Sequence, residues 1–235
     1  MIKLSKGYKT IKGPVRSEFK VKKSKFIGYL LPVKTREAAE AFIESINKKH
    51  YDANHNVPVY IIGNDSGIQK YSDDGEPSGT AGMPMLDLLK NEGFTNIAVV
   101  VTRYFGGTKL GTGGLVRAYT KSLSLALEGA SVLEKRAFVS SEMLLDYTLH
   151  GKFINYIKNN EAIILSDEVF TDQVQIKMFI KPEKFDKIKD EINDMSAGAI
   201  EIESLDQKYL TFENGYYQKE GWFHGKINKW NVRSK

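Results

Sequence analysis

The order of apolar and polar positions divides the chain into two stretches with different predicted elements. In the first stretch, apolar runs predict β-strands over residues 25–33, 57–62 and 97–101, and residues 68–71 are suited to pair with the second of them. Apolar residues at helical spacing predict helices over residues 35–50, 83–91 and 115–129. The run over residues 97–101 is apolar throughout and rich in β-branched residues, which indicates a central strand covered on both faces.

The second stretch has another order of elements. Strand patterns cover residues 143–149, 162–170, 173–180 and 199–205, and helical patterns cover residues 152–159 and 182–195. Together they give the order β-α-β-β-α-β, which is the ferredoxin-like split unit. The sequence therefore predicts an α+β protein with an N-terminal α/β domain and a C-terminal ferredoxin-like domain.

We expect an N-terminal domain at residues 1–138, a C-terminal domain at residues 139–208 and an extension at residues 209–235. The extension is rich in aromatic and basic residues and contains both tryptophans of the chain. Aromatic rings in a basic segment can stack on nucleic-acid bases, or they can dock on the protein's own surface as a small hairpin. Exposed tryptophans are disfavoured on soluble surfaces, which favours docking.

Charge is distributed unevenly, although the formal net charge of the whole chain is only +5. Residues 1–25 contain nine Lys or Arg and one Glu, whereas residues 139–210 contain eight basic and fourteen acidic residues. A basic N-terminal flank can be attracted to phosphate backbones, or it can be a solvated, Lys-rich edge of the fold. Charge patterning alone favours the second interpretation.

Composition excludes several kinds of chemistry. The chain has no cysteine, so disulfides, thiol nucleophiles, thiolate zinc sites and iron–sulfur clusters are impossible. No apolar run is long enough to cross a bilayer, and the first residues lack the apolar segment of a signal peptide. We therefore expect a cytoplasmic protein with no membrane partner.

The densest polar segment, residues 71–82, is named the acidic turn. Asp73, Asp74 and Glu76 lie within four residues and are followed by small residues. These carboxylates are suited to hold a divalent cation or a basic partner, although their spacing does not match an EF-hand loop. The alternative is a turn whose carboxylates cap the helix that follows.

A second polar segment, residues 102–114, is named the glycine loop. Its glycines leave the backbone free to turn N–H groups toward one point, and the following helix adds its positive end. Arg103, Lys109 and Arg117 supply positive charge, so the segment predicts an anion site, although it matches neither a Walker A loop nor a dinucleotide-binding motif. The alternative is a tight crossover that only lets the helix pack on the sheet.

The histidines indicate no catalytic or metal site by their spacing. His50 and His55 are five residues apart, which suits neither the HExxH motif nor a zinc finger. His55 can act as a general base only where the fold places it beside a substrate. We therefore predict no metal, no cofactor and no specific catalytic residue.

The acidic turn and the glycine loop together resemble the signature of the IMPACT family, which includes the bacterial YigZ-type proteins. The resemblance rests on the runs YSDDGEPSGTAGMPMLDLL and VVVTRYFGGTKLGTGGLVRAY and covers about residues 19–129. It implies an N-terminal domain like the second domain of a small-subunit ribosomal protein, and a C-terminal domain like the last domain of elongation factor G. It also implies a link to translation, because eukaryotic relatives act in translational control.

The resemblance and the charge of the two segments give the candidate binding residues. They are His55, Asp73, Asp74, Glu76, Arg103, Tyr104, Gly106, Gly107, Lys109, Gly111, Gly113, Gly114 and Arg117. We expect the acidic turn and the glycine loop to lie within about 10 Å of one another in one exposed polar hollow.

Three hypotheses of function remain open at the level of the sequence. The first is a non-enzymatic binding protein linked to translation regulation, which contacts RNA, the ribosome or a translation-related protein and holds an anion at the glycine loop. The second is a phosphate-ligand or metal-dependent enzyme that uses the acidic turn. The third is a protein-binding adaptor that uses the acidic C-terminal domain.

Overall fold

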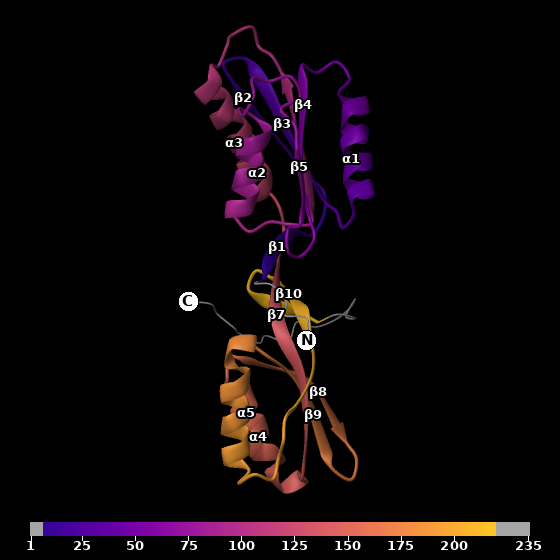
Figure 1. Ribbon diagram of the computed structural model, residues 1–235, viewed down its shortest axis with the longest axis vertical. Coiled ribbons are helices and arrows are strands. Elements are labelled where there is room, and N and C mark those ends of the chain that lie inside the picture. The colour runs from indigo at the N-terminus through magenta and orange to yellow at the C-terminus, as the bar shows by residue number, and fades with distance from the viewer. Residues whose placement is uncertain (1–6, 220–235) are drawn as a thin grey trace. The chain divides into compact units, whose positions relative to one another are not determined.

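The computed structural model describes residues 7–219, and these form two compact units (Figure 1). The N-terminal unit comprises residues 8–134, and the C-terminal unit comprises residues 135–219 together with Gly7. Each unit is a mixed α/β structure with its own hydrophobic core. None of the helices within residues 7–219 has the length and apolar character that a membrane span requires.

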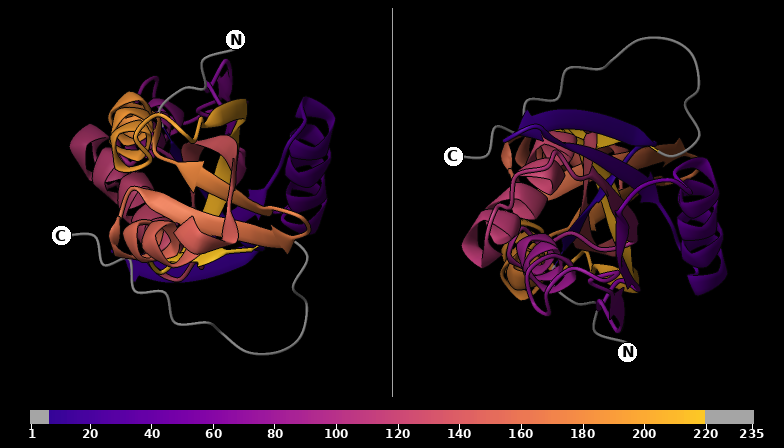
Figure 2. Two further views of the ribbon diagram at one scale, coloured as in Figure 1. Left: turned by 90° about the horizontal axis from the view of Figure 1, so that it is seen from below. Right: turned by 90° about the horizontal axis from the view of Figure 1, so that it is seen from above.

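The N-terminal unit is a five-stranded antiparallel sheet with helices on both faces. Across the sheet, the strands are β2 (Val15–Val21), β3 (Ser24–Pro32), β6 (Ile97–Tyr104), β4 (His55–Ile62) and β5 (Ile68–Tyr71). Helix α1 (Arg36–Lys49) covers one face, and α2 (Gly82–Asn91) and α3 (Thr112–Glu128) cover the other (Figures 1 and 2). A short strand, β1 (Tyr8–Ile11), lies at one end of this sheet (Figure 1).

Strand β6 is central, as its apolar sequence predicts. Every residue from Ile97 to Arg103 is buried. Val99 and Val101 pack into the cluster that includes α2 and α3, whereas Ala98 and Val100 pack into the cluster that includes α1. Because side chains alternate between the two faces of a strand, one continuous apolar run serves both cores.

The basic flank contains two strands that its apolar pattern does not predict. Residues 8–11 form β1, and residues 15–21 form β2 at the edge of the sheet. Along β2, exposed Arg16, Glu18 and Lys20 alternate with partly buried residues. Charged residues on an edge strand oppose pairing with other chains, so this stretch agrees with the interpretation of a solvated, Lys-rich edge.

The C-terminal unit has the predicted β-α-β-β-α-β order. Its elements are β7 (Val132–Leu145), α4 (Tyr147–Asn159), β8 (Ile163–Phe170), β9 (Val174–Ile180), a 3₁₀ turn (Pro182–Lys184), α5 (Phe185–Met195), β10 (Glu203–Glu213) and β11 (Tyr216–Gln218). The strands lie in the order β11-β10-β7-β9-β8, so the first and third strands of the split unit are neighbours. Strand β7 runs through residue 138, where we expected the domains to meet.

The last strand of the split unit differs from the prediction. Ile200 and Ile202 are buried in the core without belonging to a strand, and β10 begins only at residue 203 and continues to residue 213. β10 and β11 form a hairpin whose turn residues, Asn214 and Gly215, both have positive φ. Phe212 packs with Phe138 and Leu210, so the described part of the aromatic extension docks on its own unit. Trp222, Phe223 and Trp230 lie outside the described residues.

Candidate functional site

The acidic turn and the glycine loop meet at the end of the N-terminal sheet that lies away from β1 (Figure 1). The register brings His55 of β4 beside Arg103 of β6, and Lys25 of β3 beside Tyr104. Arg103 then contacts Glu76 of the acidic turn, with 2.6 Å between Nη1 and Oε1. The two segments therefore converge, but the Arg103 and Glu76 side chains that join them are buried and do not line an exposed hollow.

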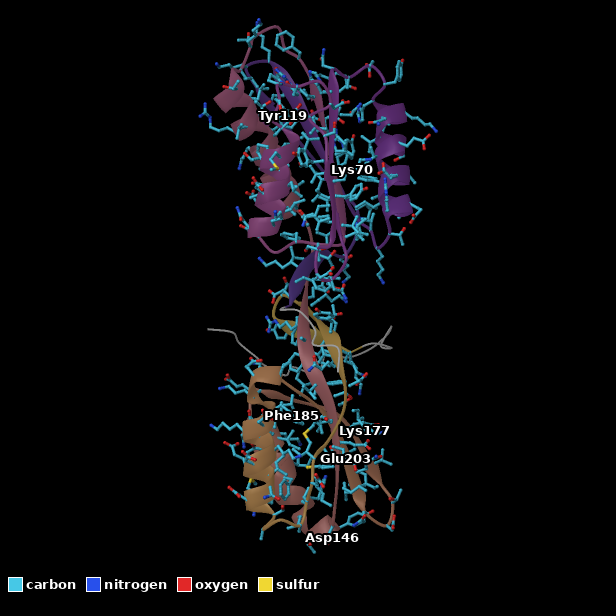
Figure 3. All side chains as sticks on the ribbon, in the orientation of Figure 1. Lys70, Tyr119, Asp146, Lys177, Phe185 and Glu203 are labelled. Atoms are coloured by element: carbon cyan, nitrogen blue, oxygen red, sulfur yellow. The ribbon has the colours of Figure 1, made fainter. Side chains whose placement is uncertain are left out.

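Glu76 and Arg103 form a buried ion pair. Their exposed fractions are 7% and 6%, and Tyr119 of α3 donates a second hydrogen bond to the same carboxylate oxygen at 2.7 Å. Burial and the neighbouring Glu76 carboxylate raise the pKa of Tyr119, so its hydroxyl remains a donor. Figure 3 labels Tyr119 between α3 and the sheet. A paired guanidinium at this depth joins strand, turn and helix instead of facing an external phosphate.

Asp73 caps the helix that follows the acidic turn. Its carboxylate accepts hydrogen bonds from the backbone N–H groups of Gly79, Ala81 and Gly82, at 2.8, 3.1 and 2.8 Å. These groups lie just before or at the start of α2, where helical N–H groups have no intrahelical acceptor. The capping alternative is therefore confirmed for this carboxylate.

Asp74 and His55 hold the acidic turn against β4. The Asp74 carboxylate accepts from the N–H of Asn56 at 2.6 Å, and the Asp74 carbonyl accepts from Nδ1 of His55 at 2.7 Å. The other ring nitrogen, Nε2, lies 3.8 Å from Oε1 of Glu76. Among residues 7–219, no group of three acidic or histidine side chains has the geometry of a metal site.

Gly106 is required for close packing between the glycine loop and the turn that joins β2 and β3. A Cβ atom at this position would lie only 2.0 Å from the carbonyl carbon of Lys23. The Gly106 N–H also donates to Oγ of Ser24 at 3.1 Å. Gly107 and Gly111 have φ angles of 80° and 75°, which side chains other than hydrogen rarely allow. Part of the glycine signature thus serves the fold itself.

The outer part of the glycine loop has a different character. Helix α3 begins after Gly111 with no side-chain cap and no acidic residue in its first turn, which contains Gly113 and Gly114. Lys109 and Arg117 are exposed, and neither forms a salt bridge within the part of the chain that the structure describes. The N-terminal end of α3 carries the positive end of the helix dipole, which adds to the positive charge of these two side chains.

Tyr104 belongs to a hydrogen-bonded chain that the sequence did not reveal. Its hydroxyl donates to Asp52 at 3.0 Å and accepts from Nδ1 of His50 at 2.9 Å, while the Tyr29 hydroxyl donates to Nε2 of His50 at 2.7 Å. Burial, together with the charge of Lys49, lowers the pKa of His50, which keeps the ring neutral. These partners are separated by 21 to 54 positions in the sequence, so no local pattern connects them.

The comparisons with known proteins agree with this arrangement of domains. Residues 22–127 match the model of the Impact N-terminal domain, and residues 144–199 match a domain of unknown function, DUF1949. Among solved structures, the crystal structure of a hypothetical protein is similar, with a TM-score of 0.54 and 31% identity, over 86% of this chain and 99% of that one.

Two bacterial proteins are similar over nearly their whole lengths. IMPACT family member YvyE of Bacillus subtilis (strain 168) is 37% identical over 203 residues, which cover 86% of this chain and 93% of the relative. IMPACT family member YigZ of Escherichia coli (strain K12) is 33% identical over 83% of this chain and 96% of the relative. The chain therefore belongs to the IMPACT family.

Proposed function

We propose that this chain is a non-enzymatic binding protein linked to translation, and that it contacts RNA or ribosomal particles through the outer surface of the glycine loop. Family membership supports the link to translation, because the signature resembles that of eukaryotic proteins that act in translational control. We also propose that the two units share the folds of a ribosomal-protein domain and of the last domain of elongation factor G.

A group of unpaired cations at one end of the N-terminal unit carries the proposal. This group, named the basic end, consists of Lys22, Lys23, Lys25, Lys109 and Arg117. Within residues 7–219, none of them forms a salt bridge, whereas other cations of the unit, such as Arg16, Lys48 and Lys70, pair with glutamates.

The close approach of Gly106 to Lys23 brings the glycine loop and the β2–β3 turn side by side. Cations on both segments thus lie around the uncapped start of α3. Phosphate groups are attracted both to Lys and Arg side chains and to the free N–H groups of a helix start. The arrangement suits a polyanion such as an RNA backbone.

The enzyme hypothesis has less support because the carboxylates of the acidic turn are engaged inside the protein. Asp73 binds backbone N–H groups, Asp74 binds the N–H of Asn56, and Glu76 pairs with Arg103. A divalent cation at the acidic turn would have to compete with these donors. The turn therefore supports the fold that presents the basic end.

Salt dependence of binding tests the proposal. We expect the full chain to bind a structured RNA or ribosomal particles, with an affinity that falls linearly on a log–log plot as salt rises. The double variant Lys109→Gln/Arg117→Gln is expected to bind about ten-fold more weakly and to lower the slope by about 1.5. The control is Lys34→Gln, which removes an exposed lysine at the other end of the unit.

Two results would contradict the proposal. One is an affinity that does not change between low and high salt. The other is a double variant that binds as well as Lys34→Gln while both retain the melting temperature of the wild type.

A further inference from the structure

The turn at residues 50–54, named the aromatic turn, is fixed against the end of β6. The N–H of Asn54 donates to the carbonyl of Arg103 at 3.1 Å, and the Asn54 side chain accepts from the N–H of Phe105 at 2.7 Å. The Tyr104 hydroxyl binds both Asp52 and His50. Contacts at three of its five residues therefore attach the aromatic turn to the end of β6.

Two aromatic rings beside these contacts are exposed to solvent. Tyr51, the second residue of the aromatic turn, is 86% exposed, and Phe105, which follows β6, is 44% exposed. The Arg103 guanidinium lies 5.5 Å from the centre of the Phe105 ring, so a buried cation supports one side of this ring. Neither ring belongs to the hydrophobic clusters of the unit, so both are accessible to a ligand.

Two lysines lie against other aromatic rings at the same end of the sheet. The Lys25 ammonium lies 4.4 Å from the centre of the Tyr104 ring, and Lys49 lies 5.1 Å from that of Tyr29. Lys25 belongs to the basic end, so the cations and the exposed rings occupy the same end of the sheet. Asp52 is the acidic residue of the aromatic turn, and its carboxylate accepts from Tyr104.

We propose that Tyr51 and Phe105 are stacking platforms for unpaired bases, so that this end of the molecule binds single-stranded RNA. The inference rests on the proposed function, because it assumes that the basic end contacts the phosphates. Bases in a duplex are already stacked and cannot cover a protein ring, whereas those of a single strand are free to do so. Stacking on a ring accepts every base, so binding has little sequence preference.

Direct binding measurements with the full chain test this inference. The probes are an oligouridylate of about twelve nucleotides and an RNA duplex of similar charge. Tyr51→Ala and Phe105→Ala are each expected to weaken binding of the single strand about ten-fold and to leave the salt slope unchanged. Tyr51→Phe and Phe105→Tyr retain a ring and are expected to bind as the wild type does.

Matched controls come from exposed rings of the C-terminal unit. Tyr147 is 52% exposed and Phe170 is 55% exposed, so Tyr147→Ala and Phe170→Ala each remove an exposed aromatic ring from the other unit. Both controls are expected to bind the oligouridylate normally. All variants are compared at equal fractions folded, measured by circular dichroism.

The possible outcomes separate this inference from the proposed function. If Tyr51→Ala and Phe105→Ala bind the single strand normally while Lys109→Gln/Arg117→Gln binds weakly, the stacking inference is overturned and the proposed function stands. Tighter binding of the duplex than of the single strand overturns the inference in the same way. If the wild type binds neither RNA at low salt, both proposals fail.

Discussion

Because Glu76 and Arg103 form a buried ion pair, the stability of the N-terminal unit is sensitive to substitutions that change either charge. Oε1 of Glu76 receives hydrogen bonds from Arg103 and Tyr119, and the Arg103 guanidinium lies 5.6 Å from the centre of the Phe26 ring and 5.5 Å from that of the Phe105 ring. A charge in such surroundings depends on its partner, because water cannot replace it. Because Arg103 also contacts the Phe105 ring, a substitution that breaks the pair is expected both to destabilise the unit and to disturb this ring.

We predict that Glu76→Gln lowers the free energy of unfolding by about 3–5 kcal/mol, because it leaves the Arg103 charge buried without a counter-ion. The measurement is urea denaturation of the full chain. The control is Glu92→Gln, since the exposed pair of Glu92 and Lys9 is expected to contribute less than about 1 kcal/mol. Equal destabilisation by the two substitutions would contradict the prediction.

The lowered pKa of His50 predicts that the folded protein is less stable in mild acid than at neutral pH. Burial lowers its pKa in the folded protein, whereas in the unfolded chain the ring titrates near about pH 6.5. Below that pH the unfolded state therefore binds more protons than the folded state, and stability falls as the pH decreases. The charges around the ring are those of Lys49, Asp52, Lys25 and Arg16.

The test compares the free energy of unfolding at about pH 7.5 and about pH 5.5 in the wild type and in His50→Gln. The variant is less stable at both values because it loses hydrogen bonds with two tyrosines. It is nevertheless expected to lose less stability than the wild type between them. A difference between the two pH values that is as large in the variant would show that His50 does not carry the effect.

The glycine loop and the β2–β3 turn pack so closely at Gly106 that no space remains for a side chain. We predict that Gly106→Ala destabilises the protein by about 3 kcal/mol or more, because the new methyl group meets the backbone of Lys23. The control is Gly13→Ala, where a Cβ atom would have no neighbour within 4 Å. The measurement is thermal unfolding, and a similar melting temperature for the two variants would refute the packing argument.

Most helices and strands follow from sequence periodicity, and the exceptions have identifiable physical causes. β1 has only four residues, which is too short for a clear apolar pattern. β2 lies at the sheet edge, and the charged residues on its exposed face alternate with the apolar ones and weaken its apolar pattern. Residues 199–202 alternate as a strand does, but Ile200 and Ile202 contribute to the core without pairing in the sheet. An alternating pattern shows which side chains are buried. It does not show whether the backbone pairs with a neighbouring strand.

The convergence of the candidate site could be predicted, but not the direction of its side chains. The two segments follow strands that finish at the same end of the sheet, and the acidic turn and the glycine loop contain charges of opposite sign, which attract one another. That Glu76 and Arg103 pair internally depends on Tyr119, which is 43 residues from Glu76 in the sequence. No local pattern in the sequence indicates the contacts of the aromatic turn either, because its partners lie on β3 and β6.

The whole molecule combines two units with separate cores and different charge. The unpaired cations and exposed rings that carry the proposals belong to the N-terminal unit, whereas residues 139–210 contain six more acidic than basic residues, fourteen against eight. Because anionic ligands are repelled by acidic surfaces, the N-terminal unit is the expected contact for RNA.

Because the two units have separate hydrophobic cores, we predict that a substitution that destabilises one unit leaves the stability of the other unchanged. Ile192 of α5 is completely buried in the C-terminal core, so Ile192→Ala is expected to cost about 2–5 kcal/mol. Amide hydrogen exchange in β8 and β9 should then accelerate, while exchange in β3 and β6 and the affinity for RNA stay unchanged. Leu123→Ala, in the core beneath α3, should produce the reverse pattern. If either substitution accelerates exchange equally in all four strands, the units unfold together, and the basic end depends on the whole chain.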